Sequence, residues 1–99
     1  MPAIARINDQ FSGICCCHSG CIFMTGYIIE GNANHLSGGS PVSYLGATVI
    51  GYCGHTGTII SASSKVSTNN IQVAYLGSAV SGCLIGSIVT GNGNHTVGI

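Results

Sequence analysis

Four cysteines and one histidine lie within nine positions, in the segment GICCCHSGC at residues 13–21. Such a cluster suits three kinds of chemistry: a disulfide framework, a metal site or a reactive thiol. Two further cysteines and a nearby histidine follow in the segments GYCGH and SGC. Thiolate and imidazole groups are the ligands that zinc prefers, usually four of them in a tetrahedron. The rest of the chain must therefore decide which chemistry applies.

The beginning of the chain, MPAIARINDQ, lacks the basic stretch and apolar run that are typical of a secretory signal peptide. We therefore expect the chain to be made and folded in a reducing cytoplasm, where clustered cysteines are metal ligands or reactive thiols more often than disulfides. This interpretation favours a metal site, then free structural thiols, and disulfides least.

Charged residues are unusually scarce. The 99 residues contain four of them, and the formal net charge is zero. A protein that neutralises nucleic-acid phosphates needs a basic patch, which one Arg and one Lys cannot form. The two carboxylates lie near no recognisable catalytic partner, so we predict that the protein is not an enzyme. We expect a single domain over residues 1–99.

The distribution of glycine indicates a β protein. Sixteen glycines are spread through the chain, and Val, Ile, Thr, Ser and Asn dominate between them. Glycine and β-branched residues both disfavour helix. Short apolar runs bounded by Gly and Asn, such as TGTIISASS, predict short strands joined by tight turns. We therefore predict an all-β fold with little or no helix.

The chain also contains an internal repeat. The segments PVSYLGATVIGYCG and QVAYLGSAVSGC align, and the first part of the chain fits the same pattern with a longer loop. Three copies result, at about residues 2–40, 41–70 and 71–99. They predict a small pseudo-threefold cone, although repetition alone would also allow a stacked solenoid. The equivalent positions are Arg6, Tyr44 and Tyr75; Asp9, Ala47 and Ser78; and His35, Val66 and His95.

Three cysteines take similar places in the three copies. Cys15 lies six residues after Asp9, and Cys53 lies six residues after Ala47. Cys83 lies five residues after Ser78. Equivalent positions near a threefold axis converge, so we predict three thiolates around one structural zinc, with iron less favoured. A nearby histidine would complete the tetrahedron. The candidate ligands, at most four at once and with Cys83 and Cys53 ranked first, are Cys15, His18, Cys53, His55 and Cys83.

The remaining cysteines and histidines have simpler interpretations. Cys16, Cys17 and Cys21 have no equivalents in the other copies, so we expect loop packing or a spare ligand. The alignment of the copies places His35 and His95 at inward positions of strands. We interpret them as core or interface histidines rather than as a second metal site, because Val66 stands where a third ligand would be needed.

The opening MPAIARIND resembles the Pro-Ala-Ala-Arg motif of the PAAR-repeat proteins, with Asn8-Asp9 in place of their usual Gly-Asp. PVSYLGA and QVAYLGS stand where that family repeats its motif. The resemblance covers essentially the whole chain, and Cys83 and His55 match the family's metal-binding Cys and a family His. Tyr44, Ala47, Tyr75 and Ser78 depart from the family's Arg and Asp.

The resemblance implies a pointed β cone without enzymatic activity, stiffened by an apical zinc. Such proteins cap a trimeric β-helical spike at the tip of a contractile phage tail or a type VI secretion system. It therefore implies one copy per spike trimer, a virion tail tip or secreted apparatus as location, and transient contact with the target membrane. From the copy alignment we expect the base, with Ala3, Val42 and Val73, to contact the spike.

Two other classes of function remain open. A free-standing β-rich binding module would need no metal. A metal-handling or redox protein built on CCCH would need exposed thiols of low pKa, and the cluster has no Lys or Arg nearby to lower them.

Overall fold

The computed structural model describes residues 3–63, 67–68 and 71–96, with only the backbone described for residues 33–35, 67–68 and 92–96. Within these residues the fold is all-β, as predicted, and no helix that could cross a membrane is present. The described strands are β1 Ala3–Ile4, β2 Gln10–Cys15, β3 Ile22–Ile28, β4 Asn32–Ser37, β5 Ser40–Val42, β6 Thr48–Gly51, β7 Thr56–Ile59, β8 Ser67–Thr68, β9 Ile71–Gln72, β10 Ala79–Gly82, β11 Leu84–Ile88 and β12 Asn92–Thr96.

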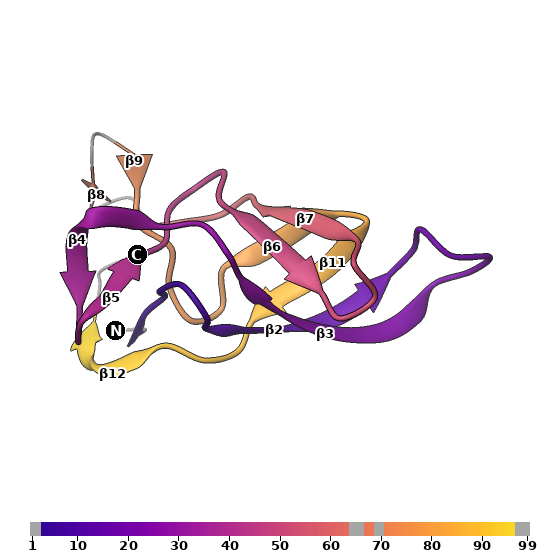
Figure 1. The fold of residues 1–99 in the computed structure, drawn as a ribbon, viewed down its shortest axis with the longest axis horizontal. Coiled ribbons are helices and arrows are strands. Elements are labelled where there is room, and N and C mark those ends of the chain that lie inside the picture. The colour runs from indigo at the N-terminus through magenta and orange to yellow at the C-terminus, as the bar shows by residue number, and fades with distance from the viewer. Residues whose placement is uncertain (1–2, 64–66, 69–70, 97–99) are drawn as a thin grey trace.

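Three antiparallel hairpins form a closed six-stranded barrel in the order β10-β11-β2-β3-β6-β7. Each hairpin comes from a different copy of the repeat. The other strands form three two-stranded sheets, β4–β5, β8–β9 and β12–β1, and each of them links one copy to the next. Figure 1 shows these pairs at one end of an elongated molecule, with the loop between β2 and β3 projecting at the other.

Backbone bridges confirm the pseudo-threefold relation of the copies. One bridge joins each neighbouring pair and uses equivalent residues: Arg6 with Val42, Tyr44 with Val73, and Tyr75 with Ile4. A ring of hydrogen bonds repeats the cycle, because Ala5 N–H donates to Ala74 O, Ala74 N–H to Ser43 O and Ser43 N–H to Ala5 O, each at 3.0 Å. The copies therefore close around an axis and do not stack as a solenoid.

The first turn of each copy also repeats. Its central residue has a positive φ: 74° at Asn8, 91° at Gly46 and 103° at Gly77. Asn and Gly are the residues that tolerate this conformation best. The carboxylate of Asp9 accepts from Arg6 N–H at 2.7 Å, and the hydroxyl of Ser78 accepts from Tyr75 N–H at 2.9 Å. Asp and Ser thus perform the same local task.

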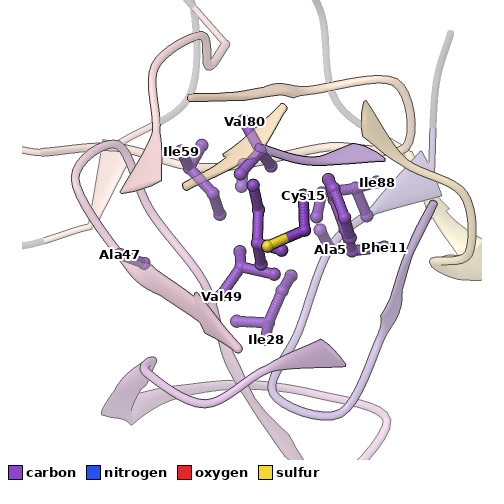
Figure 2. Close-up of a cluster of buried hydrophobic side chains, with 11 residues drawn as sticks. Ala5, Phe11, Cys15, Ile28, Ala47, Val49, Ile59, Val80 and Ile88 are labelled. Carbon is purple, nitrogen blue, oxygen red and sulfur yellow. The ribbon is translucent and has the colours of Figure 1, made fainter. Parts of the chain in front are cut away.

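The core is built in layers around the axis. Figure 2 shows the buried apolar side chains inside the barrel. The layers consist of equivalent residues, one from each copy, and nearly every member is fully buried. They are Ile4, Val42 and Val73; Ala5, Ser43 and Ala74; Asp9, Ala47 and Ser78; Phe11, Val49 and Val80; and Ile28, Ile59 and Ile88.

This layering corrects the predicted partner contacts. Val42 and Val73 have no exposed surface and pack with Ile4 in a second small core. Residues at equivalent positions close to an axis meet each other, so they are not available to a partner. Ala3, the third predicted contact, is partly exposed and pairs with Thr96 in β12. The interpretations of His35 and His95 lie outside the described side chains.

Pairs of glycines let neighbouring copies approach closely at three equivalent places. The register pairs Gly13 with Gly86, Gly26 with Gly51, and Gly57 with Gly82. A Cβ on Gly26 would overlap the carbonyl oxygen of Ile50 and lie 2.8 Å from the α-carbon of Gly51. A side chain there would force the two strands apart.

We expect Gly26→Ala to destabilise the protein by about 3 kcal/mol, because rigid backbone atoms cannot yield to the added methyl group. Gly20→Ala is the matched control, since a Cβ at Gly20 meets no atom within 4 Å and should change stability by less than about 0.5 kcal/mol. Urea unfolding measures both. Equal stability of the two variants would contradict the close approach of the copies.

A carboxylate network links the first copy to the second. Glu30 accepts from Tyr44 Oη at 2.8 Å, from Thr48 N at 3.0 Å and from Thr48 Oγ1 at 3.1 Å. The Tyr44 hydrogen bond and then the Thr48 amide hold the pKa of Glu30 below its ordinary 4.5. Burial, followed by the Glu30 hydrogen bond, raises the pKa of Tyr44.

The lowered pKa of Glu30 predicts a pH-dependent contribution to stability. The unfolded chain binds the proton more readily, so the contribution is present above pH 4.5 and is lost as the pH falls through the folded pKa. We expect Glu30→Gln to be less stable than the natural protein near neutral pH and to approach it in acid. Urea unfolding of both proteins with a chelator present measures this. A gap that widens in acid would contradict it.

Candidate metal centre

Four side chains converge beyond the core layers, at the end of the barrel that carries the β2–β3 loop. Cys15 is the last residue of β2, and His18 lies in the loop that follows. Cys53 and His55 lie in the turn between β6 and β7. Four of the five predicted candidate ligands therefore gather in one place, and the fifth, Cys83, does not.

The turn between β6 and β7 is held by short backbone hydrogen bonds. Gly54 N–H donates to Gly51 O at 2.9 Å, and Gly51 N–H donates to His55 O at 2.9 Å. Gly54 has a φ of 91°, a value that glycine adopts without strain. This turn sets the spacing of Cys53 and His55, so the two side chains face Cys15 on the neighbouring hairpin.

The donor atoms are close enough to share one ion. The two sulfur atoms of Cys15 and Cys53 lie 3.7 Å apart, and His55 Nδ1 lies 3.3 Å from the first and 3.5 Å from the second. The rings of His18 and His55 pack edge to face with centroids 4.7 Å apart. All four ligand atoms lie within 4.8 Å of one another, so the cluster could hold a metal ion.

The surroundings suit a structural ion. Cys15 is buried, Cys53 and His55 are half-buried, and His18 is exposed. Four donors from the protein fill a tetrahedral coordination sphere and leave no position for a substrate. Two cysteines can bind as thiolates, and together they would neutralise a divalent cation. An ion held by all four residues would therefore cross-link two hairpins and a loop.

Cys83, which we ranked first among the ligands, does not belong to this cluster. Its sulfur is bonded to Cys17, and the buried residue beside it is Leu84. Leu84 follows Ser78 by six residues, as Cys15 follows Asp9, and β11 pairs Leu84 with Cys15. A shift of one residue along a strand moves a side chain to the opposite face. Counting six residues onward from Asp9, Ala47 and Ser78 gives Cys15, Cys53 and Leu84. That count would have assigned Leu84, and not Cys83, to the equivalent position.

The structure also corrects the expectation about disulfides. Cys16 is bonded to Cys21 and Cys17 to Cys83, whereas Cys15 and Cys53 are free. The second bond joins residues 66 positions apart and connects the β2–β3 loop to the third copy. By loop-closure entropy such a bond stabilises the folded state by about 4 kcal/mol. Cys16, Cys17 and Cys21, for which the sequence predicts loop packing or a spare ligand, thus serve as cross-links.

Neither the protein-family models nor the curated protein sequences contain a match to this chain.

We expect Cys53→Ser to weaken metal binding by more than about 100-fold. Loss of a residue that only orients a ligand lowers metal affinity about 10–100-fold, and loss of the ligand itself should lower it further. Titration with Co²⁺ measures this through the thiolate charge-transfer band. Tyr52→Phe is the control, since Tyr52 lies in the same turn but contributes no ligand. Equal affinity of the two variants would rule out Cys53 as a ligand.

Proposed function

We propose that this protein is the zinc-stabilised tip of a trimeric β-helical spike in a contractile injection machine, a PAAR-like protein of a phage tail or a type VI secretion system. The observation that carries the proposal is the closed pseudo-threefold ring of Ala5, Ser43 and Ala74. A single chain with this symmetry can present three similar surfaces to a true trimer.

The geometry of the donor atoms supports zinc as the ion. Zinc binds sulfur at about 2.3 Å and nitrogen at about 2.0–2.1 Å, so tetrahedral angles place two sulfurs about 3.8 Å apart and sulfur and nitrogen about 3.6 Å apart. The observed separations of 3.7, 3.3 and 3.5 Å are close to these values. When bound, the ion would fix the loop and the β6–β7 turn to β2.

The shape and the distribution of charge support the role of a tip. The described charged residues, Arg6, Asp9 and Glu30, all lie outside the hairpin ends that surround the metal centre. The closed barrel pairs its strands without a free edge, whereas among the described residues β8 forms a ladder with β9 alone and β12 with β1 alone. These two strands lie at the opposite end of the molecule (Figure 1), and their outer edges would offer templates for strand addition from a partner.

Exposed apolar residues at this end suit a contact with the spike. Leu36 in β4 is 54% exposed and Ile71 in β9 is 40% exposed. They belong to two of the three sheets that link the copies. They replace the buried Val42 and Val73 as the side chains that a partner could reach.

We expect one copy of the protein to bind one spike trimer and to carry one zinc ion, as measured by light scattering and elemental analysis of the complex. Leu36→Glu and Ile71→Glu should each weaken the complex by about 10-fold or more, because an interface would bury the new charge. Their zinc content should be unchanged.

Phe23→Glu is the matched control. Phe23 is an exposed residue of β3 near the opposite end and should leave spike binding unchanged. Three copies per trimer, or no complex, would reject the role of a spike tip. A metal-free complex with the correct ratio would reject only the zinc.

A further inference from the structure

The four candidate ligands are not held in the same way. Cys15 is fixed by the pairing of β2 with β3 and β11, and the β6–β7 turn fixes Cys53 and His55. His18 lies in residues 16–21, which form no strand. The position of His18 therefore depends on how this loop is attached to the barrel.

Both disulfides attach that loop. Cys16–Cys21 closes the loop across its base, and Cys17–Cys83 ties the residue beside His18 to the junction of β10 and β11. One backbone hydrogen bond supports them, in which Cys16 N–H donates to Cys83 O at 2.9 Å. The side chain of His18 is exposed, so core packing does not hold it in place.

We propose that the metal centre is redox-linked: the two disulfides hold His18 against the other three ligands, and their reduction weakens metal binding. This inference rests on the metal site of the proposed function. It adds that the ion is held most tightly once the loop has been oxidised.

The chemistry is ordinary thiol–disulfide exchange. A dithiol reductant attacks Cys17–Cys83, the S–S bond breaks, and the bond accepts two electrons and two protons to give two thiols. The reductant leaves as its own disulfide. A disulfide-containing oxidant reverses the step, and Cys16–Cys21 reacts in the same way. Cys15 and Cys53 keep their oxidation state throughout, since they act as ligands.

The linkage matches the difference between cellular compartments. A reducing cytoplasm keeps thiols reduced, whereas extracellular and periplasmic spaces favour disulfides. In the reduced chain three ligands remain on the barrel, and ordering the His18 loop opposes binding. In the oxidised chain the loop is already ordered. Outer contacts that orient a metal ligand change affinity by about 10–100-fold, and we expect a change of that size.

The test compares two forms of the natural chain without oxygen. One form has both disulfides intact, and the other has been reduced with a phosphine. Competition with a colorimetric zinc chelator gives the affinity, and the Co²⁺ spectrum reports the ligand set. We expect the oxidised form to bind zinc about 10–100-fold more tightly. Equal affinities would overturn the redox linkage, whereas no binding in either form would overturn the metal centre itself.

Two variants show whether the effect acts through His18. His18→Ala should bind zinc weakly and equally in both redox forms, and a remaining gap would overturn the inference. The double variant Cys17→Ser/Cys83→Ser should bind like the reduced natural chain without any reductant, provided that its circular dichroism shows folding. If it does not fold, the comparison of His18→Ala with the natural chain still decides the question.

Discussion

The ring of backbone hydrogen bonds among Ala5, Ser43 and Ala74 holds the three copies at one distance from a common axis. Each bond joins a different pair of copies, so the three bonds together close a circle. The barrel hairpins, the buried layers and the linking sheets repeat the same threefold arrangement around it. The paired glycines, such as Gly26 with Gly51, allow the copies to pack this closely, because side chains there would push the hairpins apart.

Closure around an axis also brings together the side chains of the candidate metal centre. The layers of the core end where Cys15, Cys53 and Leu84 occupy related positions, and two of the three offer a thiolate. A perfect threefold arrangement would have provided three sulfurs. The leucine in the third copy breaks that symmetry, and His18 and His55 supply the missing donors. The metal site is therefore an asymmetric feature built on a symmetric frame.

Cross-links replace much of what a larger core would supply. A chain of this size buries only a modest apolar surface, and long glycine-rich hairpin ends are costly to order. The disulfide between Cys17 and Cys83 and the candidate metal site both act at the same end of the barrel. Rigidity there suits the proposed tip. The opposite end exposes the apolar side chains of Leu36 and Ile71, as the proposed contact with a spike requires.

The sequence by itself determined the all-β class and the three copies with their equivalent turns, because glycine spacing and repeats are local properties of the chain. It also selected five candidate ligands, Cys15, His18, Cys53, His55 and Cys83, and the first four of them lie together in the structure. Only the tertiary structure decided that Leu84, not Cys83, faces the axis, that Val42 and Val73 are buried, and that the remaining cysteines pair. Those facts depend on strand register and on distances between residues far apart in the chain. A one-residue difference in spacing moves a side chain to the opposite face of a strand.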